Sequence, residues 1–319
     1  MEVIHQIGNL TEKIGIKKYV LICYDWYIEW KSYINYLKYK KKDALFVSQN
    51  PVPQIFSIDE TLDYLIATHK SVCRYGDGEF NLIQNHSIGF QTASAQLSER
   101  LAEILCTPTD NLLVCIPGIF TMPAVYTKKT RNFWNRILVC DRPKWYRHLN
   151  FDYHYGNADI TRCYIGIEDK TASRKYFEKL ISLWEDKNVL LIEGQQSRLG
   201  VGNDLFQNVR SLKRILCPAL NAFSYYDEIR NASLKHAENA DIILLALGPT
   251  ATVLAYDLSV CGKRVLDIGN VDNEYDWFRA GAKKKIRNPL KFSMEVKNGG
   301  HTEPCLDETY LSQIAEVIV

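Results

Sequence analysis

The sequence has no excess of charge of either sign. Its 39 lysines and arginines are balanced by 37 aspartates and glutamates, which gives a formal net charge of +2 and a pI near 8.0. Proteins that recruit nucleic acid through their overall field carry a strongly basic surface. The balance therefore predicts no nucleic-acid partner, and any anionic ligand must be bound by a local group of residues.

Closely spaced cysteine pairs are also absent. This excludes zinc knuckles and CxxC redox motifs. Several cysteines lie inside apolar runs, where a free thiol behaves as a small core side chain. We therefore expect a protein of the reducing cytosol. The nine cysteines are Cys23, Cys73, Cys106, Cys115, Cys140, Cys163, Cys217, Cys261 and Cys305.

No segment has the length and composition of a membrane span or a signal peptide. The longest uncharged apolar stretch, residues 242–256, is broken by Gly248 and Pro249, and it is shorter than the roughly 20 residues that cross a bilayer. Charged residues at positions 2, 12 and 13 interrupt the apolar region that a signal peptide requires. We expect a cytoplasmic protein, either soluble or peripheral at the inner face of the cell membrane.

From about residue 70 onward, short apolar or β-branched runs alternate with longer helical patterns. The runs predict strands at residues 71–75, 112–116, 189–193, 214–217, 242–247 and 264–268. Residues 250–261 predict a helix that joins the last two strands in a right-handed βαβ crossover. The alternation is typical of α/β proteins, and it predicts a Rossmann-like, mainly parallel sheet flanked by helices.

Residues 1–54 have a different pattern, which predicts an N-terminal helical extension. Aromatic and aliphatic side chains recur at three-and-four spacing from Tyr19 to Leu37, and a basic cluster follows at residues 38–42. Pro51 and Pro53 mark a linker to a domain of residues 55–319. The apolar face predicts a helix that docks on that domain or on a second subunit of a homodimer. The alternative is an interfacial helix, residues 19–42, that rests on anionic lipid.

The acidic pair Asp77 and Glu79 directly follows a predicted strand, in the segment RYGDGE. Gly76 and Gly78 allow a backbone turn that directs both carboxylates to the same side. Mg²⁺ or Mn²⁺ bound with a diphosphate uses one or two carboxylates and fills its other positions with phosphate oxygens and water. The pair therefore predicts a divalent metal site at the carboxyl end of a strand, where α/β sheets bind ligands. The alternative is a turn whose acids are solvated.

A glycine loop, the segment SRLGVGND at residues 197–204, follows the strand of residues 189–193. Gly200 and Gly202 allow backbone N–H groups to approach a phosphate, and Arg198 can pair bidentately with its oxygens. Asn203 or Asp204 is expected to cap a helix through residues 206–209. The other loops expected at this edge of the sheet are PALNA, with Asn221, and the GPT loop of Gly248, Pro249 and Thr250.

Glu193 ends the strand before the glycine loop, and two roles are open to it. Its carboxylate is a candidate for the catalytic base that deprotonates an acceptor hydroxyl. Equally, it is a candidate to anchor Arg198 in a salt bridge. The loop itself is not a dinucleotide fingerprint, because Leu205 occupies the place of the third glycine.

Five strings, in this order, resemble the GT-D type glycosyltransferases. They are RYGDGEFNLI, IEGQQSRLGVGNDLF, RILCPALNAFSYYDEI, ALGPTATVLAYDLS and DIGNVDNEYDWF. That family is bacterial, was first known as a domain of unknown function, and is found in surface-glycoprotein and polysaccharide gene clusters. The resemblance covers residues 58–296 and so implies that the domain of residues 55–319 is catalytic.

The resemblance implies transfer of a hexose, glucose or galactose, from a UDP-sugar to a glycan acceptor. The acceptor is lipid-linked or on a protein, in surface polysaccharide or glycoprotein synthesis. The metal is expected on the acidic pair. The residues expected around the donor are Arg74, Arg198, Asn203, Asp204 and the GPT loop.

Two positions depart from the family pattern, and two other functions remain open. Gln195 and Asn270 stand where an acid and a histidine are frequent in the family, which concerns the acceptor side or the catalytic base. One alternative is a nucleotide-dependent oxidoreductase on a similar sheet. The other is a non-catalytic scaffold that binds a partner through the N-terminal helix.

Overall fold

The structure, a computed structural model, describes residues 17–319, without the side chains of residues 17–22, 24 and 25. The start of the predicted extension, residues 1–16, lies outside the described residues, as do the side chains of Tyr19 and Ile22. Contacts divide the chain into two compact units. The helical unit comprises Met1–Pro51 and Lys129–Arg147, and the sheet unit comprises Val52–Lys128 and His148–Val319. The predicted domain boundary at residue 54 stays a prediction, although residues 129–147 group with the N-terminal helix.

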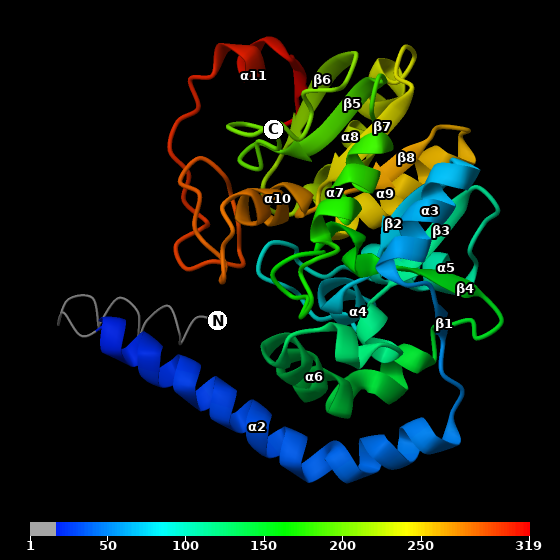
Figure 1. The fold of residues 1–319 in the computed structure, drawn as a ribbon, viewed down its shortest axis with the longest axis vertical. Helices are drawn as coiled ribbons and strands as arrows, with labels where there is room; N and C mark the ends of the chain where they lie inside the picture. The colour runs from blue at the N-terminus through cyan, green and yellow to red at the C-terminus, as the bar shows by residue number, and fades with distance from the viewer. Residues whose placement is uncertain (1–16) are drawn as a thin grey trace. The chain divides into compact units, whose positions relative to one another are not determined.

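The sheet unit contains a nine-stranded sheet in which every pair of neighbouring strands is parallel (Figure 1). The spatial order is β1-β4-β3-β2-β8-β7-β5-β6-β9. The strands are β1 (Gln54–Ile55), β2 (Ser71–Arg74), β3 (Leu112–Ile116), β4 (His154–Asn157), β5 (Asn188–Gly194), β6 (Ser211–Cys217), β7 (Ile242–Ala246), β8 (Val265–Asp267) and β9 (Ile314–Val317). The predicted α/β fold with a mainly parallel sheet is confirmed.

Six of these strands lie where the sequence predicts them, and burial explains why. All five residues of β3 are buried, as are the first four of β7. Strands that are covered on both faces have continuous apolar sequences, and such runs are a clear sequence pattern. The predicted βαβ unit is also present, because β7 and β8 pair in parallel on either side of α9 (Pro249–Val260).

Three strands were not predicted, and each is short or partly exposed. β1 has two residues, β4 has the sequence HYGN, and burial in β9 alternates residue by residue. β1 and β9 are the two edges of the sheet, where one side of the strand has no neighbour. Edge strands need less apolar surface, so their sequences give a weaker signal.

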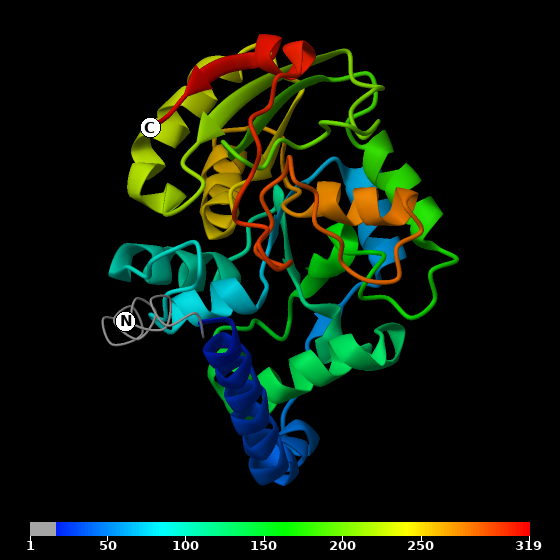
Figure 2. The same ribbon diagram turned by 90° about the vertical axis from the view of Figure 1, so that its left-hand side faces the viewer.

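Helices cover both faces of the sheet (Figure 2). α3 packs against α7, whereas α9 packs against both α5 and α8. The helices of the sheet unit are α3 (Ile58–Thr68), α4 (Asp77–Ile83), α5 (Ala95–Cys106), α7 (Ser173–Ser182), α8 (Tyr226–His236), α9, α10 (Val271–Arg279) and α11 (Glu308–Ser312). Short 3-10 turns are η1 (Gly118–Phe120), η2 (Pro123–Val125), η3 (Ala158–Thr161) and η4 (Ala222–Tyr225).

The helical unit consists of α2 (Lys17–Gln49) and α6 (Lys128–Tyr146). An ion pair between Arg142 and Asp43, 2.8 Å, and an edge-on ring contact between Phe46 and Tyr146 hold them together. The predicted N-terminal helix is therefore present. No helix within residues 17–319 is both long and apolar enough to cross a bilayer. All nine cysteines are free.

Candidate functional site

The acidic pair lies where β2 gives way to α4. β2 ends at Arg74, Gly76 is the residue before α4, and Asp77 begins the helix. The carboxylate of Glu79 turns back and accepts a hydrogen bond of 2.7 Å from the backbone N–H of Gly76. This contact fixes one oxygen of Glu79 and orients the side chain. Both acids are partly buried, so they are not the solvated turn considered as the alternative.

Burial and neighbouring negative charges both raise the pKa values of the pair. Burial raises the pKa of Asp77, although the nearby Arg162 guanidinium opposes the shift. Burial also raises the pKa of Glu79 to about 7, against the hydrogen bond from Gly76, and the negative charges of Asp267 and Asp77 add to the rise. A site that concentrates carboxylates at this cost is one that a bound cation would stabilise.

The pair fits a divalent cation that shares its coordination with a substrate. No group of three or more His, Cys, Asp or Glu side chains suitable for a metal occurs within residues 17–319. A cage made by the protein alone is thus not present there. Two carboxylates are what Mg²⁺ and Mn²⁺ use beside a diphosphate and water.

Arg74 connects three segments around the pair, and four hydrogen bonds from its guanidinium are directed to them. Its guanidinium pairs with the Asp267 carboxylate at 2.8 Å and donates to the backbone oxygens of Asp267, Gly269 and Ala158. Only 11% of its side chain is exposed. Arg74 thus positions the ends of β2 and β8 relative to each other. Its predicted contact with the nucleotide-sugar donor stays a prediction.

Arg162 was not predicted from the sequence, yet it is the cation beside Asp77. It follows η3, forms an ion pair with Glu295, and keeps 41% of its side chain exposed. Glu295 also pairs with Lys285 and accepts a hydrogen bond of 3.0 Å from Asn270. Burial opposes ionisation of Glu295, but the two cations outweigh it and lower its pKa to about 2. The partner of Arg162 is therefore a permanent anion.

The GPT loop reaches the same edge of the sheet. Gly248 has a positive φ of 54°, and a Cβ there would lie 2.6 Å from the ring of Phe90, so only glycine fits. The hydroxyl of Thr252 donates to the backbone oxygen of Arg74 at 3.0 Å, which joins this loop to the end of β2. The hydroxyl of Thr250 is buried and has no hydrogen-bond partner among the described residues.

Asn221, from the PALNA loop, is connected to the GPT loop by the segment that contains Phe90. Its backbone N–H donates to the Phe90 oxygen at 2.9 Å, and its side-chain oxygen accepts from the N–H of Thr92 at 2.7 Å. Asn221 therefore positions the chain that packs on Gly248. The sequence predicted that Asn221 lies at this edge of the sheet, but it did not predict this positioning role.

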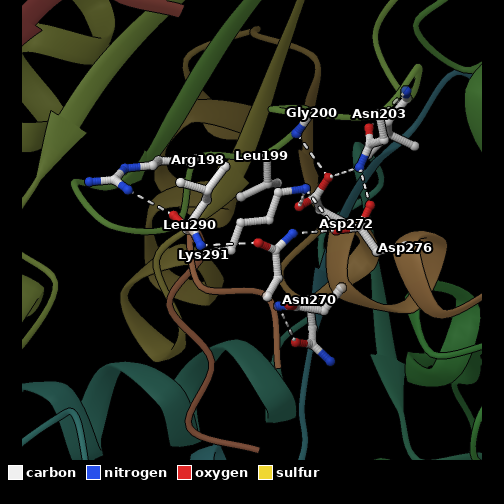
Figure 3. A network of polar contacts seen from close by, with 12 residues as sticks. Arg198, Leu199, Gly200, Asn203, Asn270, Asp272, Asp276, Leu290 and Lys291 are labelled. Atoms are coloured by element: carbon white, nitrogen blue, oxygen red, sulfur yellow. Dashed lines mark hydrogen bonds and ion pairs between the residues drawn. The ribbon is translucent and has the colours of Figure 1, made fainter. Parts of the chain in front are cut away.

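The glycine loop differs from the prediction because its polar groups are bound inside the protein (Figure 3). The N–H of Gly200 donates to Asp272 at 2.8 Å, and the amide of Asn203 donates to Asp272 and Asp276, each at 2.7 Å. The ammonium group of Lys291 completes the network, 2.6 Å from Asp272 and 2.9 Å from Asp276. Gly202, in the same loop, has open space around its Cα.

The predicted helix through residues 206–209 is wrong, because this segment forms turns. The Asn203 oxygen accepts the N–H of Leu205 at 3.1 Å, which is a local turn rather than a helix cap. Asp204 instead accepts a hydrogen bond of 3.0 Å from the Tyr275 hydroxyl and pairs with Arg279. Because no helix begins at Asn203 or Asp204, the glycine loop does not offer a phosphate the partial positive charge of a helix N-terminus.

Arg198 has a positive φ of 50°, and its guanidinium donates to the backbone oxygens of Leu290 (2.8 Å) and Glu303 (2.6 Å). It thus holds the C-terminal segment and does not pair with Glu193. Its predicted contact with phosphate remains a prediction that this conformation does not support.

Glu193 has the anchoring role, with a different partner from the one expected. It is fully buried, pairs with the Arg214 guanidinium at 2.5 Å, and accepts the N–H of Leu199 at 2.8 Å. Burial raises its pKa, and the positive charge of Arg214 opposes the rise. With both oxygens bound inside the fold, Glu193 has no oxygen free for an acceptor hydroxyl, so we no longer assign it the role of base.

Comparisons with known proteins agree with this arrangement. Residues 72–296 match the family described as "Glycosyltransferase GT-D fold". A probable glycosyl transferase of Streptococcus gordonii is 43% identical over 82% of the chain, and glycosyltransferase GlyD of Streptococcus pneumoniae serotype 4 is 41% identical over 83%. The chain spans 38% and 33% of the lengths of these two proteins.

Solved structures give the same result. A glycosyltransferase with domain of unknown function 1792 from Streptococcus sanguinis is 42% identical, with a TM-score of 0.80 that covers 84% of this chain and 100% of that one. A second structure, described as domain of unknown function 1792 with a distinct glycosyltransferase fold, is 40% identical. It also has a TM-score of 0.80, over 84% of this chain and 96% of that one.

Proposed function

This chain belongs to the GT-D glycosyltransferase family, and we propose that it moves a hexose, glucose or galactose, from a UDP-sugar to a glycan acceptor. The acceptor is lipid-linked or on a protein, in the synthesis of a surface polysaccharide or glycoprotein. The proposed cofactor is Mn²⁺ or Mg²⁺. Family membership replaces the oxidoreductase and scaffold alternatives, because both assume a chain that is not a glycosyltransferase.

The observation that carries the proposal is the acidic pair. Asp77 and Glu79 lie two residues apart in sequence after the carboxyl end of β2, with raised pKa values and without a third protein ligand in the described residues. Such a pair would hold the cation by itself and leave positions for diphosphate oxygens. When bound, the cation neutralises charge that develops on the diphosphate as it leaves.

The chain's own residues supply three further functions. The backbone N–H of Gly76 keeps the Glu79 carboxylate oriented through one of its oxygens. Arg162, with part of its side chain exposed beside Asp77, is positioned to pair with an oxygen of the leaving diphosphate. Arg74 holds the ends of β2 and β8 in place and so fixes the pair.

The GPT loop is proposed to bind the diphosphate on its other side. It begins α9, a helix of twelve residues whose N-terminal end carries partial positive charge. The Thr250 hydroxyl is buried and has no partner among the described residues, so a phosphate oxygen would satisfy it. In this proposal the GPT loop would supply a hydroxyl and the helix end to the diphosphate, and the acidic pair would hold the cation.

A donor screen tests the proposal. The chain is incubated with UDP-glucose, UDP-galactose and other nucleotide sugars, with Mn²⁺ or Mg²⁺ and then with EDTA, and released nucleotide is measured. We expect UDP release from a UDP-hexose that requires the metal and resumes when the metal is restored. Equal release in EDTA contradicts the metal assignment, and release only from a different nucleotide sugar contradicts the donor.

A further inference from the structure

The near-neutral charge of the whole chain conceals two units of opposite charge. The helical unit carries 14 lysines and arginines against six aspartates and glutamates, a formal charge of +8. The sheet unit carries the other 25 basic and 31 acidic residues, a formal charge of −6. A basic surface restricted to one unit indicates that this unit meets an anionic partner.

The same unit exposes a row of large apolar side chains along α2. Trp26, Trp30, Tyr33 and Leu37 recur at spacings of four, three and four, which places them on one face of the helix. Trp26 is 76% exposed and Trp30 is 62% exposed, whereas most tryptophans in folded proteins are largely buried. This aromatic row therefore needs a partner outside the helical unit.

α6 does not cover the aromatic row, because it uses another side of α2. Asp43 pairs with Arg142, and Phe46 contacts Tyr146. At about 100° per residue, Asp43 and Phe46 point away from the face that carries Trp26 and Trp30. The helix thus has one side occupied by α6 and another that carries the aromatic row, with the exposed Glu29 at its border.

Exposed lysines adjoin the aromatic row. Lys38, Lys40, Lys41 and Lys42 follow Leu37 directly, and all four are exposed. Lysines beside tryptophan and tyrosine are the composition of helices that lie in the boundary between lipid headgroups and acyl chains. The long lysine stems reach from an apolar surface to anionic phosphates.

We propose that the helical unit binds the surface of a bilayer that contains anionic phospholipid. The aromatic row enters at headgroup depth, and the four lysines contact lipid phosphates. Aliphatic side chains next to the row, such as Ile34 (41% exposed), have a place in the acyl region but none on a nucleic acid. The +8 charge also opposes pairing with a second copy of the same unit. This inference stands independently of the proposed reaction.

Vesicle binding by the 319-residue chain tests the proposal. The chain is sedimented with vesicles of phosphatidylcholine alone or with 30% phosphatidylglycerol, at about 0.05 M and 0.5 M salt. We expect binding to the anionic vesicles that weakens at high salt, because added ions screen the attraction. Absence of binding to anionic vesicles at low salt overturns the proposal.

Tryptophan fluorescence shows whether the aromatic row itself enters the bilayer. The other four tryptophans are buried, so acrylamide quenching and the shift of the emission on binding report on Trp26 and Trp30. Those four are Trp134, Trp145, Trp184 and Trp277. We expect a blue shift and quenching by brominated lipid, both absent in a Trp26→Phe, Trp30→Phe double variant. Bound protein with unchanged emission, or α2 tryptophans already shielded without vesicles, overturns the proposal.

A charge variant with a matched control tests whether the lysines of α2 bind the anionic lipid. Lys38, Lys40, Lys41 and Lys42 are changed to Gln together, and the control changes four exposed lysines of the sheet unit, Lys213, Lys283, Lys284 and Lys297, to Gln. Each lysine near an anionic surface contributes a factor of roughly five to partitioning. We expect a loss of about a hundredfold or more in the first variant, and much less in the control. Equal losses overturn the proposal, as does an α2-dependent dimer that excludes vesicles.

Discussion

The acidic pair after β2 and the glycine loop after β5 have similar sequences and different physical states. Each joins glycines to charged residues at the end of a buried strand. In the acidic pair, burial raises both pKa values, and no metal-binding cluster of three acidic, His or Cys side chains occurs in residues 17–319. In the glycine loop, Arg198, Gly200 and Asn203 all have partners inside the fold.

The difference separates residues that bind a ligand from residues that hold the fold. A buried carboxylate with a raised pKa costs stability, and a bound cation would recover that stability. A loop in which Arg198, Gly200 and Asn203 already bind inside the fold has less to offer a phosphate without rearrangement. Variants at the two sites should accordingly affect activity at one and stability at the other.

The largest effect is expected for Asp77→Asn. It removes half of the proposed metal site, so kcat should fall on the order of a thousandfold, because the cation supplies several kcal/mol to the transition state. The unfolding temperature should change little, since the variant removes a buried charge. UDP release and thermal unfolding measure the two. The matched control is Glu185→Gln, an exposed acid, which should keep full activity. Full activity of Asp77→Asn contradicts the metal assignment.

Glu193→Gln should give the opposite result. It leaves Arg214, 3% exposed, without its counter-charge, which costs about 3–5 kcal/mol. The unfolding temperature should fall by roughly 10 °C, while the folded enzyme keeps its activity at low temperature. Asp186→Asn, which breaks an exposed pair with Arg210, should leave the unfolding temperature nearly unchanged, because exposed ion pairs contribute little to stability. Loss of transfer with unchanged stability in Glu193→Gln would return Glu193 to the role of base.

Arg162→Ala tests whether the Arg162 guanidinium binds the diphosphate beside the acidic pair. Loss of a charged donor to the diphosphate should lower kcat/KM about a hundredfold and weaken UDP binding in titration calorimetry. Arg210→Ala, at an exposed ion pair in the same unit, serves as the control and should change neither. Equal results for the two variants would remove Arg162 from the site.

The smallest effect concerns the stability of the metal-free protein. The folded pKa of Glu79, about 7, exceeds its ordinary value of 4.5. The folded state therefore binds a proton more tightly, and stability falls as pH rises from about 4.5 to 7. Glu79→Gln removes this fall and should stabilise the metal-free chain by about 1–2 kcal/mol at pH 8, measured by denaturant unfolding in EDTA. Destabilisation at pH 8 would show that the carboxylate is structural.

The proton on Glu79 also competes with the metal. Mn²⁺ affinity of the unmodified chain should weaken as pH falls below about 7, because the bound form needs an ionised carboxylate. Calorimetry in buffers of different ionisation enthalpy counts the released protons. A pH-independent affinity would place the metal elsewhere.

The sequence predicts the centre of the sheet and the acidic pair because both leave local signals. β3 and β7 are continuous apolar runs, and RYGDGE combines acids with glycines at the end of β2. The edge strands β1 and β9 leave weak signals, since they are short or half exposed.

Other parts of the site depend on contacts between distant residues. Arg162 meets Glu295 across 133 positions of sequence, and no motif around either residue announces the pair. Asn203 carries the residue type of a helix cap, but its amide is taken by Asp272 and Asp276, which lie about 70 positions later. Residue type alone does not decide between a cap and a turn.

The segment after α10 has a practical consequence for anyone who prepares shorter versions of this protein. The family match ends at residue 296, but β9 pairs with β6 beyond that point and Arg198 relies on the Glu303 oxygen. At the other end, α3 and β1 precede residue 72. A fragment cut to the matched residues would expose the β6 edge to aggregation, so the folding module is wider than the recognisable sequence.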